Sequence, residues 1–131
     1  MMYKIGDKIP NGETMLRRIK LCWVDDDLRI SPEAFSPKKG EKGHFEDGLS
    51  LDVKRLVASP IGNDYWSNVR KMATGQFLSD VVNALSSYDI IYNGPSPSHC
   101  IIAGDMVALY YDEDTRALLA ENTVIIHVPT E

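Results

Sequence analysis

Apolar and polar residues alternate in two short stretches in the first half of the chain. In residues 15–24, Ile19, Leu21 and Trp23 alternate with Lys20 and Cys22, and in residues 48–53 leucine and valine alternate with Ser50 and Asp52. A period of two residues is that of a strand with one buried face. We therefore predict strands at 15–24 and 48–53, each with one side turned toward a core.

Three further strands are indicated in the second half of the chain. Residues 89–94 and 99–104 are apolar runs separated by a turn rich in proline and serine, which predicts two strands joined by a stiff loop. In residues 123–128 apolar side chains would lie on both faces of a strand, which predicts a strand inside the sheet and not at its edge. The run at 106–111 is apolar throughout and fits either a strand or a helix.

Capping residues and helical spacing predict short helices between these strands. The serine and proline that open residues 31–35 are typical of a helix start, so one helical turn is expected there. Residues 63–73 have apolar residues at helical spacing, residues 79–85 begin with a capping serine, and residues 112–122 have acids in the first turn. Residues 36–48 are rich in glycine and charge, which predicts an exposed loop.

Strands and short helices follow one another without a regular strand–helix–strand rhythm, which indicates an α+β fold. We expect a small, mostly antiparallel sheet with short helices packed on one side. The chain has 131 residues, of which 44% are hydrophobic, so a single domain with its own core is expected. Residues 1–13 are polar and turn-rich and are interpreted as a loosely attached N-terminal arm, with 14–131 as the single domain.

Composition narrows the location and the classes of partner. The net charge of −5 at pH 7 argues against a nucleic-acid partner, because proteins that bind nucleic acids usually present a basic face. The apolar runs are far shorter than the roughly 20 residues that span a bilayer, and the N-terminus lacks the apolar core of a signal peptide. With only Cys22 and Cys100 present, a disulfide framework is not expected. We predict a cytoplasmic protein that does not contact a membrane.

Three residues are candidates for catalysis. His99 opens a predicted strand directly after a loop, where an imidazole can be held rigidly as a general acid or base. Asp47 and Asp52 flank the strand at 48–53, and either carboxylate is a candidate for orienting the His99 ring. The alternative is that the imidazole is bonded to a nearby backbone group and that both acids are solvated turn residues.

The sequence lacks the common catalytic and metal-binding motifs. It contains no P-loop, no GxGxxG after a strand, no HExxH, no paired CxxC and no GxSxG. His99 and Cys100 are adjacent, but neighbours on a strand point to opposite faces, so a shared proton or ion is not expected. Cys100 is expected to be a buried apolar residue. No histidine or cysteine pair has zinc-ligand spacing, and we predict neither a metal nor a cofactor.

Six short segments occur in a fixed order, namely Arg17–Ile19, Trp23–Val24, Arg29–Phe35, Asp47–Asp52, Ser79–Leu85 and Pro97–Ile102. This order resembles that of a group of short, uncharacterised bacterial proteins with an "RI…W…RxSxxAF…DGLSVD" opening and a later "NPAHALI"-like segment. The resemblance covers most of residues 15–128 and implies a compact, stand-alone bacterial domain with no established activity. The chain departs from the pattern at 36–46, at 106–115, at Leu51 and at Cys100, where the group usually has valine and alanine.

The sequence supports two functions of different classes. The first is a non-enzymatic binding or accessory module that acts with a protein partner or as a homodimer, because catalytic motifs are missing and aromatic residues dominate interface hot spots. Trp23 is its aromatic candidate for binding, and the resemblance draws attention to Arg29 and to Ser50 in the same role. The second is a small hydrolase or transferase in which His99 is the general acid or base.

Overall fold

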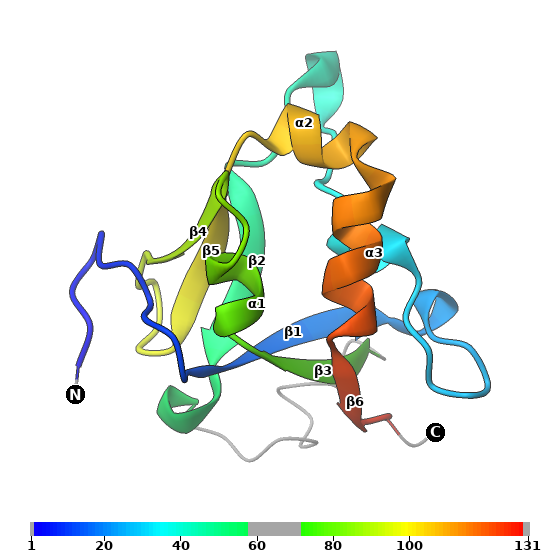
Figure 1. The fold of residues 1–131 in the computed structure, drawn as a ribbon, viewed down its shortest axis with the longest axis horizontal. Helices are drawn as coiled ribbons and strands as arrows, with labels where there is room; N and C mark the ends of the chain where they lie inside the picture. Colours follow the sequence, from blue (N-terminus) through cyan, green and yellow to red (C-terminus); the bar gives the residue numbers. More distant parts are fainter. Residues whose placement is uncertain (1, 58–71, 130–131) are drawn as a thin grey trace.

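The computed structural model describes residues 2–57 and 72–129, and these form a six-stranded antiparallel sheet with short helices (Figure 1). The order of the strands across the sheet is β4-β5-β2-β1-β3-β6. The predicted α+β fold with an antiparallel sheet is confirmed. The strands are β1 (Thr14–Lys20), β2 (Gly48–Val53), β3 (Met72–Leu78), β4 (Tyr88–Tyr92), β5 (His99–Gly104) and β6 (Val124–His127).

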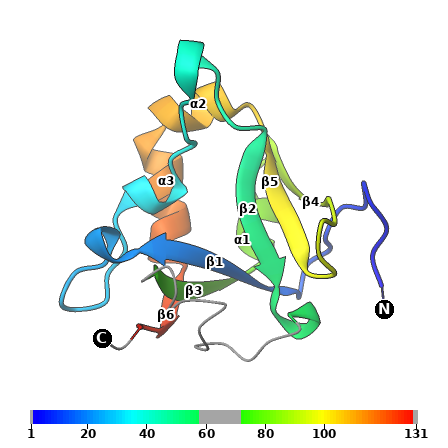
Figure 2. The ribbon, with the colours of Figure 1, turned by 180° about the vertical axis from the view of Figure 1, so that it is seen from behind.

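The sheet is divided into two halves where β1 meets β2. These strands pair only at Met15 with Val53 and at Leu16 with Asp52, whereas β1 pairs with β3 along its whole length. Beyond Leu16 the two strands separate, so β4, β5 and β2 form one half and β1, β3 and β6 the other. Figures 1 and 2 show the two halves at a steep angle to each other.

The helices lie on the inner side of this angle, as Figure 1 shows for α3 above β1 and β3. Asp105 and Asp112 cap α2 and α3, because their carboxylates accept hydrogen bonds from the backbone nitrogens of Ala108 and Thr115, each at 3.0 Å. The cap at Asp105 explains why the ambiguous run at 106–111 forms a helix. No helix in the described residues is long and apolar enough to cross a membrane. The helices are α1 (Asp80–Asn83), α2 (Met106–Tyr111) and α3 (Glu113–Glu121), and the 3-10 turns are η1 (Leu21–Trp23), η2 (Pro32–Phe35), η3 (Glu41–Gly43) and η4 (Lys54–Leu56).

The hydrophobic core fills the space between the two halves of the sheet and the helices. Phe35 of η2 is completely buried, and its ring meets that of Phe77 edge-on with 6.1 Å between centroids. The predicted helical turn at 31–35 is confirmed, with Ser31 Oγ accepting from the nitrogen of Glu33 at 3.2 Å. Other large side chains that are almost fully buried are those of Ile9, Met15, Leu16, Ile19, Leu49, Leu51, Ile90, Ile102, Leu109 and Leu119.

The segment that the sequence indicates to be a loosely attached arm runs beside β4. The nitrogen of Ile9 donates a hydrogen bond to the carbonyl oxygen of Ile90 at 2.8 Å, and the Ile9 side chain is only 2% exposed. Further along, the nitrogen of Gly12 donates to Oδ1 of Asp80 in α1 at 2.7 Å. These contacts join the second half of residues 1–13 to the sheet and to α1.

Two predicted strands differ from the structure in extent or position. The strand expected at 15–24 ends at Lys20, and the chain then turns through η1, where the nitrogen of Val24 donates to the carbonyl oxygen of Leu21 at 3.1 Å. The strand expected inside the sheet at 123–128 is β6, which lies at an edge. Of its apolar residues, Ile125 packs on the core, whereas Val124 and Ile126 are exposed.

A third difference concerns the helix predicted at 63–73. Residues 63–71 lie outside the described residues, and Met72 and Ala73 are the first residues of β3. β3 was not predicted, because Thr74 and Gly75 interrupt the apolar pattern of the segment. Glycine at position 75 fits the structure, since a Cβ there would lie 2.9 Å from Cδ1 of Ile19 on the neighbouring strand.

Candidate functional site

Three of the predicted site residues lie together on the outer face of the sheet. Asp52 of β2 is paired with His99 of β5, and directly opposed residues of antiparallel strands point to the same face. Ser50 is two residues from Asp52 and shares this face, while the residues between and beside them belong to the core. A pocket of about 340 Å³ opens here, and it is lined by Arg17, Arg18, Ser50, Asp52, Met72 and His99.

Asp52 is the most buried polar residue of this pocket, with 9% of its surface exposed. Its Oδ1 accepts a hydrogen bond from Oγ of Ser98 at 2.7 Å. Burial raises the pKa of the carboxyl group, and the Ser98 hydrogen bond and the charges of His99 and Arg18 only partly oppose this rise. The pocket therefore contains a carboxyl group that holds its proton to a higher pH than a solvated aspartate does.

We expect the replacement Asp52→Asn to change how stability depends on pH. The unfolded chain ionises this carboxyl group near the ordinary pKa of aspartate, about 3.9, whereas the folded chain keeps the proton to a higher pH. Between these two values the folded state binds more protons, so the Asp52 contribution to stability falls as the pH rises. The asparagine variant lacks this loss. Urea unfolding should therefore show the variant gaining stability relative to the wild type between pH 3.5 and pH 7, as estimated from the ~3.9 reference value of aspartate.

The matched control is Asp47→Asn, which removes the same charge from an exposed position at the other end of β2. If Asp52→Asn and the wild type differed in unfolding free energy by the same amount at the acidic and the neutral pH, the prediction would be contradicted. It would mean that burial does not hold the proton on Asp52.

His99 is oriented by an amide and not by a carboxylate. Its Nδ1 lies 2.6 Å from Oδ1 of Asn93, and an amide oxygen only accepts, so Nδ1 is the donor, and in the neutral ring this leaves Nε2 as the acceptor. The sequence led us to expect Asp47 or Asp52 in this role, and the hydrogen bond that the structure shows for the ring is the one to Asn93. Asp52 faces the ring from the neighbouring strand, but Asp47 precedes Gly48, which pairs with Ala103 at the far end of β5. The structure does not bring Asp47 to His99.

Cys100 is separated from the site in the way that strand alternation predicts. It is completely buried on the core side of β5, while His99 is half-buried on the outer side. Burial raises the pKa of the Cys100 thiol to about 12, so the thiolate that a nucleophile requires does not form near neutral pH. Among the described residues, no group of three histidine, cysteine or acidic side chains is placed to hold a metal ion.

Arg17 fills the opening that forms where β1 and β2 separate. Its Nε donates to the carbonyl oxygen of Ala34 at 2.8 Å and its Nη1 to that of Ser50 at 2.9 Å. The guanidinium also lies 5.2 Å from the centroid of the Phe35 ring. Burial lowers the pKa of Arg17 to about 10, against the charge of Glu46, so the group remains a cation at neutral pH. Arg17 thus ties β1 to η2 and to β2.

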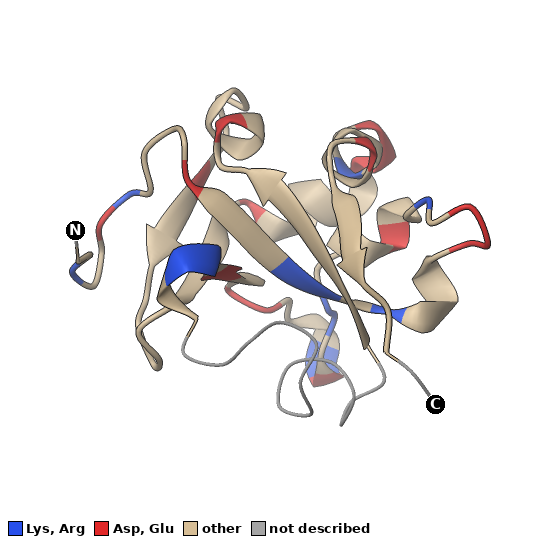
Figure 3. Ribbon diagram, turned by 90° about the horizontal axis from the view of Figure 1, so that it is seen from below, with Lys and Arg blue, Asp and Glu red and all other residues tan. Residues whose placement is uncertain are grey.

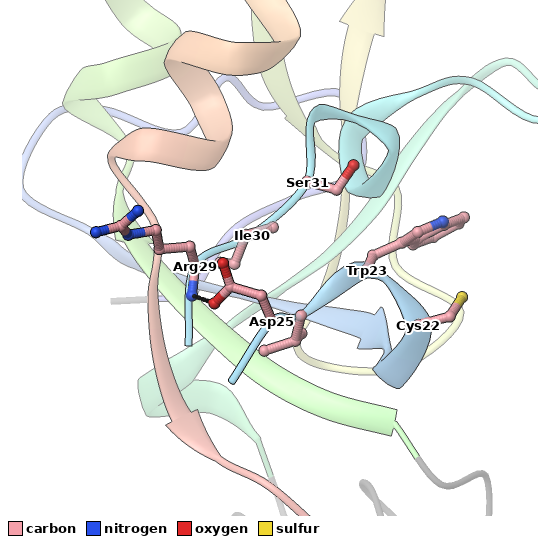
Figure 4. Close-up of a pocket in the computed structure, with 7 residues that line it drawn as sticks. Cys22, Trp23, Asp25, Arg29, Ile30 and Ser31 are labelled. Carbon is pink, nitrogen blue, oxygen red and sulfur yellow. Dashed lines mark hydrogen bonds between the residues drawn. The ribbon is translucent and has the colours of Figure 1, made fainter. Parts of the chain in front are cut away.

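A second pocket, of about 240 Å³, lies over η1 and the turn that follows it (Figure 4). In Figure 4 the side chains of Trp23 and Arg29 extend to opposite sides of the pocket. Oδ1 of Asp25 accepts hydrogen bonds from the nitrogens of Asp27 at 2.9 Å and Arg29 at 2.8 Å, which fixes the turn. The pocket is lined by Cys22, Trp23, Val24, Asp25, Arg29, Ile30 and Ser31.

A third pocket, of about 340 Å³, has lining residues in common with the other two. It shares Trp23 with the pocket over η1 and Arg17 with the pocket at His99. We call the three neighbouring pockets together, from Ile30 to His99, the β1 groove. The third pocket is lined by Arg17, Lys20, Trp23, Glu33, Ser36, Pro37, Lys38 and Glu46.

The acids of the third pocket are bonded to other parts of the chain. Glu33 forms an ion pair with Nη1 of Arg116 at 3.2 Å, and Glu46 accepts a hydrogen bond from the backbone nitrogen of Lys38. The ammonium group of Lys20, by contrast, is exposed and lies 5.0 Å from the centroid of the Trp23 ring.

Basic residues thus line the groove around an aromatic ring. In Figure 3, blue segments of the ribbon mark Lys and Arg along β1. Lys20 and Lys38 are both exposed, and Arg17 is a half-buried cation. Within the third pocket Glu33 is paired with Arg116, so exposed positive charge beside the Trp23 ring comes from Lys20 and Lys38, which favours an acidic ligand at this point of the groove.

Two residues of the site were not found from the sequence. Arg17 appeared only in the segment Arg17–Ile19, and Asn93 only inside the strand predicted at 89–94. The one signal for Arg17 is its position between the apolar residues Leu16 and Ile19 of a half-buried strand. Comparisons of the chain with models of protein families, with curated proteins and with solved structures found no match.

Proposed function

We propose that this protein is a non-enzymatic binding module that acts with a protein partner, and that an extended acidic segment of the partner lies in the β1 groove. The observation that carries the proposal is the linkage of three pockets through Trp23 and Arg17. The candidate binding residues Trp23, Arg29 and Ser50 all line this series of pockets. We further propose a location in the bacterial cytoplasm, in line with the resemblance of the sequence.

The dimensions of the groove favour an extended chain over a compact ligand. Small-molecule sites usually enclose about 300–1,000 Å³, and each of the three pockets is at or below the lower end of that range. An extended peptide places side chains at regular intervals and is recognised by a succession of small pockets. A row of linked depressions suits this type of ligand.

The chemistry of the groove favours an acidic segment with an apolar or aromatic side chain near its centre. Trp23 lines two of the pockets, and tryptophan is one of the residue types enriched at interface hot spots. Lys20 and Lys38 stand beside it and supply exposed positive charge. Their attraction for carboxylates is expected to weaken with added salt.

The experiment is selection of ligands from a displayed library of random peptides, with the immobilised protein as the target. We expect the selected peptides to be acidic, to bind less tightly as salt is added, and to lose about tenfold or more in affinity for Trp23→Ala. The control is Tyr111→Ala, which removes an aromatic side chain that is 73% exposed and lies on α2, outside the groove. Peptides that bind Trp23→Ala as well as the wild type would rule out the groove as their site.

A second candidate function is supported by the hydrogen bond between His99 and Asn93. Because Nδ1 is held by Asn93 at 2.6 Å, Nε2 is left as an acceptor, which is what a general base requires. Asp52 and Ser50 line the same pocket. We infer that, if the protein is an enzyme, it is a hydrolase or transferase with His99 as the base. Turnover of a panel of ester substrates should then fall about a hundredfold in His99→Gln, and equal turnover by both proteins would exclude this function.

A further inference from the structure

The pocket at His99 lies on the outer face of the sheet, beside the point where β1 and β2 separate. The two strands pair only up to Leu16, and Arg18 is two residues further along β1 on the same face. On β2, Asp52 lies opposite His99 of β5, and Ser50 shares its face. Three neighbouring strands therefore bring polar side chains to one pocket of about 340 Å³.

The charge of this pocket is opposite in sign to that of the whole chain. The chain has a net charge of −5 at pH 7, whereas the pocket is lined by two arginines and one aspartate, together with the imidazole of His99. The lining therefore has a net positive charge even when the aspartate is ionised. A concave site with an excess of one charge attracts ligands of the opposite charge.

Arg17 supplies this pocket with a guanidinium that is already fixed in place. Its Nε and Nη1 donate to the carbonyl oxygens of Ala34 and Ser50 at 2.8 Å and 2.9 Å. An arginine that is held in one geometry loses little conformational freedom when it binds a ligand, and its planar group matches the oxygens of phosphate and carboxylate. Glu46, whose charge acts on Arg17, lines the third pocket and not this one.

Asp52 is the one group of the lining that opposes an anion, and its surroundings weaken this effect. Its Oδ1 already accepts a hydrogen bond from Oγ of Ser98 at 2.7 Å, and its burial favours the neutral form of the carboxyl group. A neutral carboxyl group has an O–H that donates. The hydroxyl of Ser50, which is exposed, is a further donor on the same face.

We propose that the pocket at His99 binds a small oxyanion, which is the phosphate or carboxylate group of a ligand, and that Arg17 and Arg18 are its cationic contacts. The volume of the pocket, at the lower end of the range for small-molecule sites, suits a group of this size. The oxyanion site does not depend on the proposed partner segment, because it requires only the residues of this one pocket. In the second candidate function it would place an anionic group of the substrate beside His99.

The site is tested by titrating the protein with inorganic phosphate, and separately with acetate, at pH 7 and constant ionic strength. The readout is the Cε1 proton signal of each histidine in the NMR spectrum. The signal of His99, assigned by its loss in His99→Gln, should shift and reach saturation. The signals of His44 and His127, which are not among the lining residues, should stay unchanged. The anion that binds more tightly identifies the ligand group as phosphate or carboxylate, and a His99 signal that moves with neither anion would overturn the proposal.

Two variants and one control assign the charge that binds the anion. Arg18→Gln should weaken binding of the tighter anion by about tenfold or more, because it removes a charged donor. Ser50→Asp adds a carboxylate at an exposed position and should weaken binding by a similar factor, which keeps the test valid if Arg18→Gln does not fold. The control is Lys20→Gln, which removes a charge from the same face of β1 but from a residue that lines the third pocket, and it should bind as the wild type does. Wild-type affinity in Ser50→Asp, or an equal loss in Lys20→Gln, would overturn the proposed site.

Discussion

Replacing Phe35 with alanine is expected to lower the free energy of unfolding by about 3–5 kcal/mol. The ring is completely buried between the two halves of the sheet and α3, and it contacts the ring of Phe77 edge-on. It also lies against the guanidinium of Arg17. The substitution therefore removes buried apolar surface and leaves a cavity. It also removes a ring contact of Arg17, which lines two of the three pockets.

The loss is measured by urea unfolding of the purified variant, with Phe45→Ala as the control. Phe45 is only half-buried and stacks on Tyr110 near the surface, with 4.9 Å between ring centroids. The control should lose clearly less stability, because water already reaches one side of its ring. Equal losses at the two positions would mean that the core is not organised around Phe35.

Local pattern was enough to predict the parts of the fold that rest on local interactions. The strand at 48–53 was found because Leu49 and Leu51 alternate with polar residues. In β2 both leucines are buried and Ser50 is exposed, although Asp52 on the face of Ser50 is buried as well. The β4–β5 hairpin was found because its loop is built from proline and serine. The turn at 31–35 was found because Ser31 caps it. In each case the residues that decide the structure lie within a few positions of one another.

The parts that were missed depend on contacts between distant segments. An edge strand and a central strand both read as apolar runs, so the position of β6 depends on which strands pair and not on residues 123–128 alone. Its exposed Val124 and Ile126 were taken as a sign of burial.

The candidate site was predicted in part. The sequence singled out His99 and Asp52. That the two residues lie directly opposite each other is known only from the register of β2 and β5. Asp47 was an equally good candidate on sequence grounds, because it flanks the same strand from the other end. The partner of the imidazole, Asn93, could not be distinguished from an ordinary turn residue before the hairpin was known.

Replacing Arg17 with methionine is expected to lower both the stability of the fold and the affinity of the groove for acidic peptides. Two carbonyl oxygens, on Ala34 and Ser50, would lose a charged donor, which we expect to cost about 2–3 kcal/mol of unfolding free energy. Arg17→Lys keeps the charge but has no planar fork to reach both oxygens, so it should recover only part of the stability. Urea unfolding and peptide titration of each variant measure the two effects.

The control that separates these effects is Lys20→Met, on the same strand. Lys20 is exposed, so its removal should change stability by no more than about 0.5 kcal/mol, while the affinity for acidic peptides falls. Arg17→Met should lower both quantities, because Arg17 joins β1 to η2 and β2 and also lines two of the three pockets. An Arg17→Met variant as stable as the wild type would contradict the structural role of the guanidinium. Unchanged peptide affinity in both variants would mean that basic residues of the groove do not contact the ligand.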